Sequence, residues 1–167
     1  MSRRPRPRQA MSGFTYIGLL FAIAILGFAM AAVGTVWSAA AKRDREQQLM
    51  WTGGQFRRAI ASYYTNGPPG VREFPRDLAD LLEDRRGPIV RRHLRRLYPD
   101  PVTGIFDWQV LRLPDASIIG VASSSTQAPL KRAGFPDADS TFENASCYCD
   151  WRFVYLPALG RVIPTIR

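Results

Sequence analysis

The chain has 167 residues, of which 46% are hydrophobic and 22% are charged, and its formal net charge is +9. Four of the arginines precede residue 14, and without them 19 basic side chains face 14 acidic ones, a net charge of +5. About 125 residues follow the first apolar run, which suits one compact domain and leaves no room for a second of common size.

The apolar run at residues 14–41 contains no Asp, Glu, Lys or Arg. It is long enough for a transmembrane helix, since about 20 apolar residues cross a hydrocarbon core of ~30 Å. Arginines without acids precede it at positions 3, 4, 6 and 8, whereas basic and acidic residues alternate after it. The positive-inside rule therefore predicts a cytoplasmic N-terminus and an exported remainder. The alternative is a secretory signal peptide cleaved in the Ala-rich segments 29–32 or 39–41.

The segment Ser12-Gly13-Phe14-Thr15-Tyr16-Ile17-Gly18 resembles the start of type IV prepilins and of the pseudopilins of type II secretion. In that family a short basic leader ends in Gly, and a prepilin peptidase cuts before a Phe that is then N-methylated. The resemblance implies a leader at 1–13, cleavage between Gly13 and Phe14, and an apolar segment that stays in the mature protein. One position departs from the family, which usually has a Glu where this chain has Gly18.

The helical pattern continues beyond the apolar run. No proline occurs from residue 42 to 64, and apolar residues recur at helical spacing. The members of this stripe are Leu49, Phe56, Ile60, Tyr63 and Tyr64. We therefore expect one helix from Phe14 to about Tyr64, weakened or bent at Gly53-Gly54 and ended by the Asn-Gly-Pro-Pro-Gly sequence at 66–70. The alternative is a signal-anchored periplasmic domain in which this helix is only a stalk.

Small residues recur in the apolar half of the expected helix, at Gly27, Ala31 and Thr35. Four-residue spacing of small residues lets helices approach closely in membranes. We therefore expect these positions, with Phe14 and Gly18, to take part in assembly with other subunits.

Two short helices are expected next, at 75–84 with Asp77 as its cap and at 89–97. On helical spacing the second would present one positive face, made by Arg91, Arg92, Arg95 and Arg96 and flanked by Arg85 and Arg86. Such a face could contact DNA phosphates, be solvated, or meet acids of a neighbouring subunit. No aromatic residue is interleaved with these arginines, which disfavours nucleic-acid binding. His93 is expected to be a surface or boundary residue.

Alternation with a period of two then predicts strands at 106–112, 117–123 and 150–156, and an edge strand at 161–166 interrupted by Pro164. One long helix followed by a small antiparallel sheet indicates an α+β fold. This half also resembles major pseudopilins, in Asp100-Pro101-Val102-Thr103-Gly104, Asp107-Trp108, Pro129-Leu130-Lys131 and Asp150 to Tyr155. The resemblance implies a type IV pilin-like fold, with residues 42–167 as the periplasmic globular domain.

Residues that carry chemistry are few. No hydrolase or phosphate-loop motif occurs, so we expect no enzyme. Cys147 and Cys149 lack a second ligand pair for zinc, and a tight disulfide, two free thiols and an intermolecular link stay open. The segment 137–144 carries oxygen donors in an exported loop, where calcium or plain solvation is expected, and the resemblance implies a calcium site before the last strand. No cofactor is otherwise required.

The resemblance implies a structural subunit of a type II secretion pseudopilus or a type IV pilus-like filament in the bacterial inner membrane. Its partners would be other subunits, the prepilin peptidase and the assembly platform. Gly18 cannot neutralise the N-terminal amine of a preceding subunit, as the usual Glu does, which predicts a minor or tip subunit. The alternative function is a minor pilin that binds DNA through the basic helix at 85–96.

Overall fold

The computed structural model describes residues 12–68 and 70–157, and the side chains of all of these except 12–15, 29 and 31–36. The chain divides into two compact units between Ala41 and Lys42. The leader at 1–11 and the edge strand expected at 161–166 lie outside the described residues.

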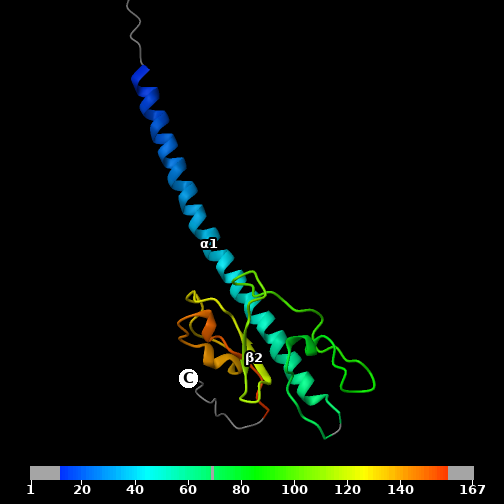
Figure 1. Cartoon of the computed structure of the whole chain (residues 1–167). Helices are drawn as coiled ribbons and strands as arrows, with labels where there is room; N and C mark the ends of the chain where they lie inside the picture. The colour runs from blue at the N-terminus through cyan, green and yellow to red at the C-terminus, as the bar shows by residue number, and fades with distance from the viewer. Residues whose placement is uncertain (1–11, 69, 158–167) are drawn as a thin grey trace, which may run out of the picture. The chain divides into compact units, whose positions relative to one another are not determined.

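The helix α1 extends from Ser12 to Thr65 and belongs to both units (Figure 1). This confirms the helix predicted from Phe14 to Tyr64. At its end the backbone N–H of Asn66 donates to the Ser62 carbonyl, and the Asn66 amide donates to the same oxygen. In the first unit the large apolar side chains from Tyr16 to Trp37 that the structure describes are exposed. Within the described residues, no helix combines the length and the apolar character needed to cross a membrane.

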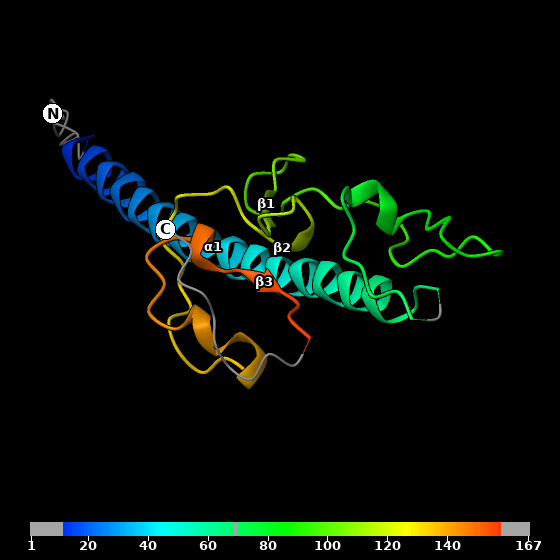
Figure 2. The same cartoon turned by 60° about the horizontal axis from the view of Figure 1, so that its bottom comes forward.

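The second unit contains a three-stranded antiparallel sheet in the order β1-β2-β3, which confirms the α+β class. Its strands are β1 (Gln109–Arg112), β2 (Ile118–Ala122) and β3 (Phe153–Val154) (Figure 2). The central strand β2 is buried along its whole length. The first and third strands are shorter than predicted. Phe106 is exposed before β1, and the 3₁₀ helix η3 (Tyr148–Asp150) occupies the predicted start of the third strand.

The apolar stripe of α1 forms the core with the sheet and the loops. Leu49, Phe56 and Ile60 are fully buried, and Tyr63 is nearly so. The Phe56 ring packs edge-to-face on Trp108, with 5.2 Å between the ring centroids. The second half of α1 is therefore part of a hydrophobic core and not a solvated stalk, as burial of one helix face predicts.

The helix does not end or change type at Gly53-Gly54. A Cβ at Gly53 would lie 2.2 Å from a ring carbon of Phe153, whereas a Cβ at Gly54 would meet nothing within 4 Å. The first glycine therefore allows β3 to approach the helix closely, a role that no local sequence pattern indicates.

Of the two short helices expected after α1, only the 3₁₀ helix η1 (Leu78–Leu81) forms. The prediction of Asp77 as its cap is confirmed, because the Asp77 carboxylate accepts from Ala79 N and the Asp80 carboxylate accepts from Asp77 N.

The prediction of a helix at 89–97 is wrong, because no helix forms there. The backbone groups of Arg91 pair with those of Asp84 at 2.8 and 3.0 Å, and the N–H groups of His93 and Leu94 both donate to the Leu81 carbonyl. These donors and acceptors bond to an earlier segment, so they are not available for the local bonds that an α-helix needs. The segment is therefore an irregular strap attached to η1.

Candidate functional site

The residues expected to direct processing and assembly lie in the first unit. Gly13 and Phe14 are in the first turn of α1, and Ala31 and Thr35 lie further along it, where side chains are not described. At Gly18 and Gly27 an added Cβ would meet nothing within 4 Å. Both glycines therefore leave open surface on the helix.

In the second unit, α1 is joined to the C-terminal loops by a buried carboxylate. Glu46 accepts hydrogen bonds from the backbone N–H groups of Leu130 and Lys131, at 2.5 and 3.3 Å, and from the Tyr148 hydroxyl at 3.0 Å. Burial, and then the bond to the Glu46 carboxylate, raise the pKa of Tyr148. Because a buried carboxylate is costly without such partners, this set of bonds defines where the loop and η3 sit on the helix.

Two further carboxylates join the loop at 100–107 to the residues directly after β2. Asp100 is fully buried and accepts from the Ser123 hydroxyl at 2.5 Å and from the N–H of Val102 at 2.8 Å. Asp107 accepts from the hydroxyls of Thr103 and Ser124, and these bonds, that of Ser124 first, lower its pKa. The loop at 100–107 thus carries two acids whose hydrogen bonds are made within the protein.

Arg86, one of the flanking arginines of the predicted basic face, bonds to other residues of the same unit. Its guanidinium binds the buried Asp84 carboxylate through Nε and Nη2 at 2.9 Å, donates to the Tyr63 carbonyl at 2.7 Å, and lies 3.5 Å from the centre of the Tyr63 ring. The hydrogen bond from Arg86 is the main reason that the pKa of Asp84 lies well below its usual range, against the opposing effect of burial. Arg86 is therefore not free to contact an external ligand.

His93 connects the strap to the end of α1. Its Nδ1 lies 2.8 Å from the Ser62 hydroxyl and its Nε2 lies 3.1 Å from the Asp84 carboxylate. An imidazole protonated on Nε2 satisfies both bonds, as acceptor from Ser62 and donor to Asp84. The residue types are those of a hydrolase triad, but Ser62 lines neither the surface hollow that includes Asp84 nor the one that includes His93. The arrangement serves to hold the strap on the helix.

An open cleft of about 470 Å³ lies between the strap and α1. Its lining consists of Trp51, Gln55, Arg92, His93, Leu94, Arg95 and Tyr98. Trp51 is 53% exposed and packs edge-to-face on Tyr98 at 5.4 Å between centroids, and the Arg96 guanidinium lies 5.0 Å from the centre of the Tyr98 ring. We name these seven lining residues the Trp51 cleft.

The structure brings together some of the predicted arginines and separates others. Arg92 and Arg95 line the Trp51 cleft, and Arg96 stands at its edge on Tyr98. Arg91 instead donates to the Asn66 carbonyl at 2.6 Å and lines a separate hollow of about 140 Å³.

Trp51 is the residue that sequence reasoning missed. It lies outside the apolar stripe of α1, among Gln47, Gln48 and Gln55. A large aromatic residue on a polar helix face was the available signal.

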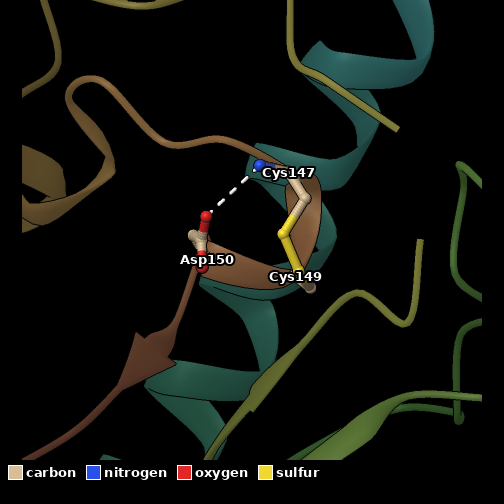
Figure 3. A group of neighbouring side chains, drawn as sticks. All are labelled: Cys147, Cys149 and Asp150. Atoms are coloured by element: carbon tan, nitrogen blue, oxygen red, sulfur yellow. Dashed lines mark hydrogen bonds between the residues drawn. A yellow bond between two sulfur atoms is a disulfide. The ribbon is translucent and has the colours of Figure 1, made fainter. Parts of the chain in front are cut away.

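The segment expected to hold calcium contains the 3₁₀ helix η2 (Asp137–Phe142). Within it, Asp139 forms an ion pair with Arg57 at 2.6 Å. The described residues include one cluster whose atoms lie close enough to share a metal ion, and it consists of Cys147, Cys149 and Asp150 (Figure 3). It contains none of the acids of the predicted calcium segment.

The two cysteines of that cluster are joined by a disulfide. The Asp150 carboxylate accepts from the backbone N–H groups of Ser146 and Cys147 and from the Ser146 hydroxyl. The disulfide therefore takes up both sulfur atoms, and the carboxylate caps η3.

Comparison of the chain with protein-family models, with curated proteins and with solved structures gives no match, so the family resemblance rests on the residues quoted from the sequence.

Proposed function

We propose that this protein is a structural subunit of a type II secretion pseudopilus or a type IV pilus-like filament, with a type IV pilin-like fold, that assembles through α1. The observation that supports this most is the contrast between the two parts of the helix. Side chains such as Ile17, Phe28 and Trp37 are exposed in the first unit, whereas Phe56 and Ile60 are buried in the second. An exposed apolar helix surface of this extent requires a covering partner, and α1 of other copies provides one.

Before assembly, residues 14–41 are held in the bacterial inner membrane, with the leader at 1–13 in the cytoplasm and residues 42–167 in the periplasm. The absence of any charged side chain in 14–41 and the arginines before it support this orientation. The prepilin peptidase and the assembly platform are the partners that such a route requires.

Intact-mass measurement of the protein from its native host tests the processing step. We expect a chain that begins at Phe14 and carries one added methyl group. Protein from a host that lacks the prepilin peptidase is the control and should retain residues 1–13. A mature chain that begins near Ala41 would show secretory cleavage and would contradict the proposal.

A charge in the apolar half tests assembly through the helix. Phe28→Asp places a carboxylate where the side chain is 81% exposed, at a cost of about 2.5–3.5 kcal/mol if the site is covered by hydrocarbon. We expect this variant to be lost from sheared fibres, whereas Phe106→Asp, at an exposed Phe of the second unit, should be recovered. Normal recovery of Phe28→Asp would refute assembly through this surface.

Gly18 indicates a minor or tip position in the filament. A subunit with Gly18 offers its own N-terminal amine to a later neighbour, but it has no carboxylate for the amine of an earlier one. Quantitative mass spectrometry of sheared fibres should find this chain at a small fraction of the major subunit. A fibre made mostly of this chain would exclude the tip position.

A further inference from the structure

We propose that the Trp51 cleft binds single-stranded nucleic acid, by stacking bases on its exposed aromatic ring and holding phosphates with its arginines. This binding function is additional to filament assembly, and it does not require that the protein forms a filament.

The Trp51 ring of the cleft is exposed and is positioned by its contact with Tyr98. Trp51 projects from α1, the longest element of the structure, and keeps 53% of its surface exposed while its ring contacts Tyr98 edge-to-face. Unpaired bases stack on such rings irrespective of sequence, because every base has a π-face. In a duplex the bases are stacked on one another and cannot reach the ring.

In the part of the chain that the structure describes, the arginines of the cleft form no ion pair, unlike others in the same unit. Arg57, Arg85 and Arg86 each form an ion pair with a carboxylate. Arg92 and Arg95 are exposed and have no carboxylate partner within residues 12–68 and 70–157, and the cleft lining includes no Asp or Glu. A guanidinium with free donors binds phosphate in a bidentate manner, so the cleft has a site for the backbone as well as for the base.

Two hollows adjoin the Trp51 ring. The cleft of about 470 Å³ is within the range of small-molecule sites, and a second hollow of about 310 Å³ shares Trp51. That hollow is lined by Asp44, Gln47 and Gln48, whose amides can bond to base edges while the acid disfavours a phosphate there. We therefore place the phosphates on the Arg92 side and the bases against Trp51.

The absence of a helix at 85–96 also favours a single strand. An element that enters the major groove of a duplex is usually an α-helix or a β-ribbon, and the strap is neither. The chain thus presents a stacking cleft and not a groove-reading element.

Fluorescence anisotropy of a labelled oligothymidylate of about 15 nucleotides, titrated with the full-length protein in a non-ionic detergent at several salt concentrations, tests the proposal. We expect Trp51→Ala to weaken binding by roughly 5- to 150-fold at unchanged salt dependence, since stacking is not ionic. Arg92→Ala and Arg95→Ala should each reduce the slope of log K against log[salt] by about 0.7. Trp51→Phe, which keeps a ring, should restore most of the affinity.

Matched controls separate the cleft from general charge. Arg58→Ala and Arg132→Ala change the net charge of the protein by the same amount as the cleft variants. Because these exposed arginines do not line the cleft, their removal should leave the affinity nearly unchanged. The cleft variants should keep the circular dichroism spectrum of the unaltered protein. If Trp51→Ala does not keep it, the reduced salt slopes of Arg92→Ala and Arg95→Ala, compared with the control arginines, carry the test.

Three results would overturn the proposal. The first is equal binding of a duplex of the same length, and the second is an equal loss from control and cleft arginines. The third is binding of polyglutamate that competes with the oligonucleotide but is unaffected by Trp51→Ala, because this would indicate a site for acidic peptides.

Discussion

Two adjacent glycines of α1 provide the most direct test of how the sheet packs on the helix. A Cβ at Gly53 would lie 2.2 to 2.4 Å from three ring carbons of Phe153, and that ring is 1% exposed and packs on Phe142 at 5.0 Å between centroids. Carbon atoms prefer separations of about 3.5–4.0 Å, so the ring would have to move by more than ~1 Å within a filled core. At Gly54 the same atom would meet nothing within 4 Å.

The two substitutions should therefore change stability in opposite directions. Alanine gains about 1 kcal/mol over glycine in a helix interior, whereas overpacking a core costs about 1–3 kcal/mol. We expect Gly54→Ala to raise the free energy of unfolding by about 0.5–1 kcal/mol and Gly53→Ala to lower it by about 1–2 kcal/mol, the propensity gain being outweighed.

Urea titration of the full chain in a non-ionic detergent, followed by tryptophan fluorescence, measures both values. An unchanged m-value in each variant shows that the midpoint reports stability and not a change in the unfolded state. If Gly53→Ala stabilised the protein as much as Gly54→Ala, the close approach of Phe153 to the helix would be refuted.

Three further predictions concern the core and its buried polar groups. Phe56→Ala should lower the free energy of unfolding by about 3–5 kcal/mol in the same titration, because it empties a fully buried site, whereas the exposed Arg58→Ala should change it by less than about 0.5 kcal/mol. Tyr148→Phe removes the donor to Glu46 and should cost about 1–2 kcal/mol near neutral pH. Because the pKa of Tyr148 is raised, the unaltered protein should lose stability as pH increases above about 10, and the variant should lose less. Asp84 has the opposite pH dependence. Because its pKa is lowered, its contribution to the free energy of unfolding is present above about pH 4 and is lost as pH falls. Asp84→Asn should therefore flatten the acid side of a plot of unfolding free energy against pH. An acid limb as steep as that of the unaltered protein would contradict the role assigned to Asp84.

Elements with a strong local pattern were predictable from the chain. The helix to Thr65 follows from an uninterrupted run without proline, and the strand at 118–122 follows from a short apolar segment bounded by turns. The strap does not form a helix because its backbone bonds to Leu81 and Asp84. Bonds to an earlier segment cannot be predicted from the local periodicity of the sequence. The third strand was shortened for a similar reason, since η3 is held by Glu46 on a distant helix.

The amino-acid sequence by itself determined that one helix carries an uncharged half and an amphipathic half, and that a small antiparallel sheet covers the latter. Only the tertiary structure decided the partners of individual polar groups, which depend on contacts between residues far apart in the chain. It pairs Arg86 with Asp84 and, among the residues that the structure describes, leaves Arg92 and Arg95 without a carboxylate partner. It also brought Trp51 from the helix to Tyr98, because the strap folds back along α1 and its folding is directed by buried hydrogen bonds that no local pattern encodes.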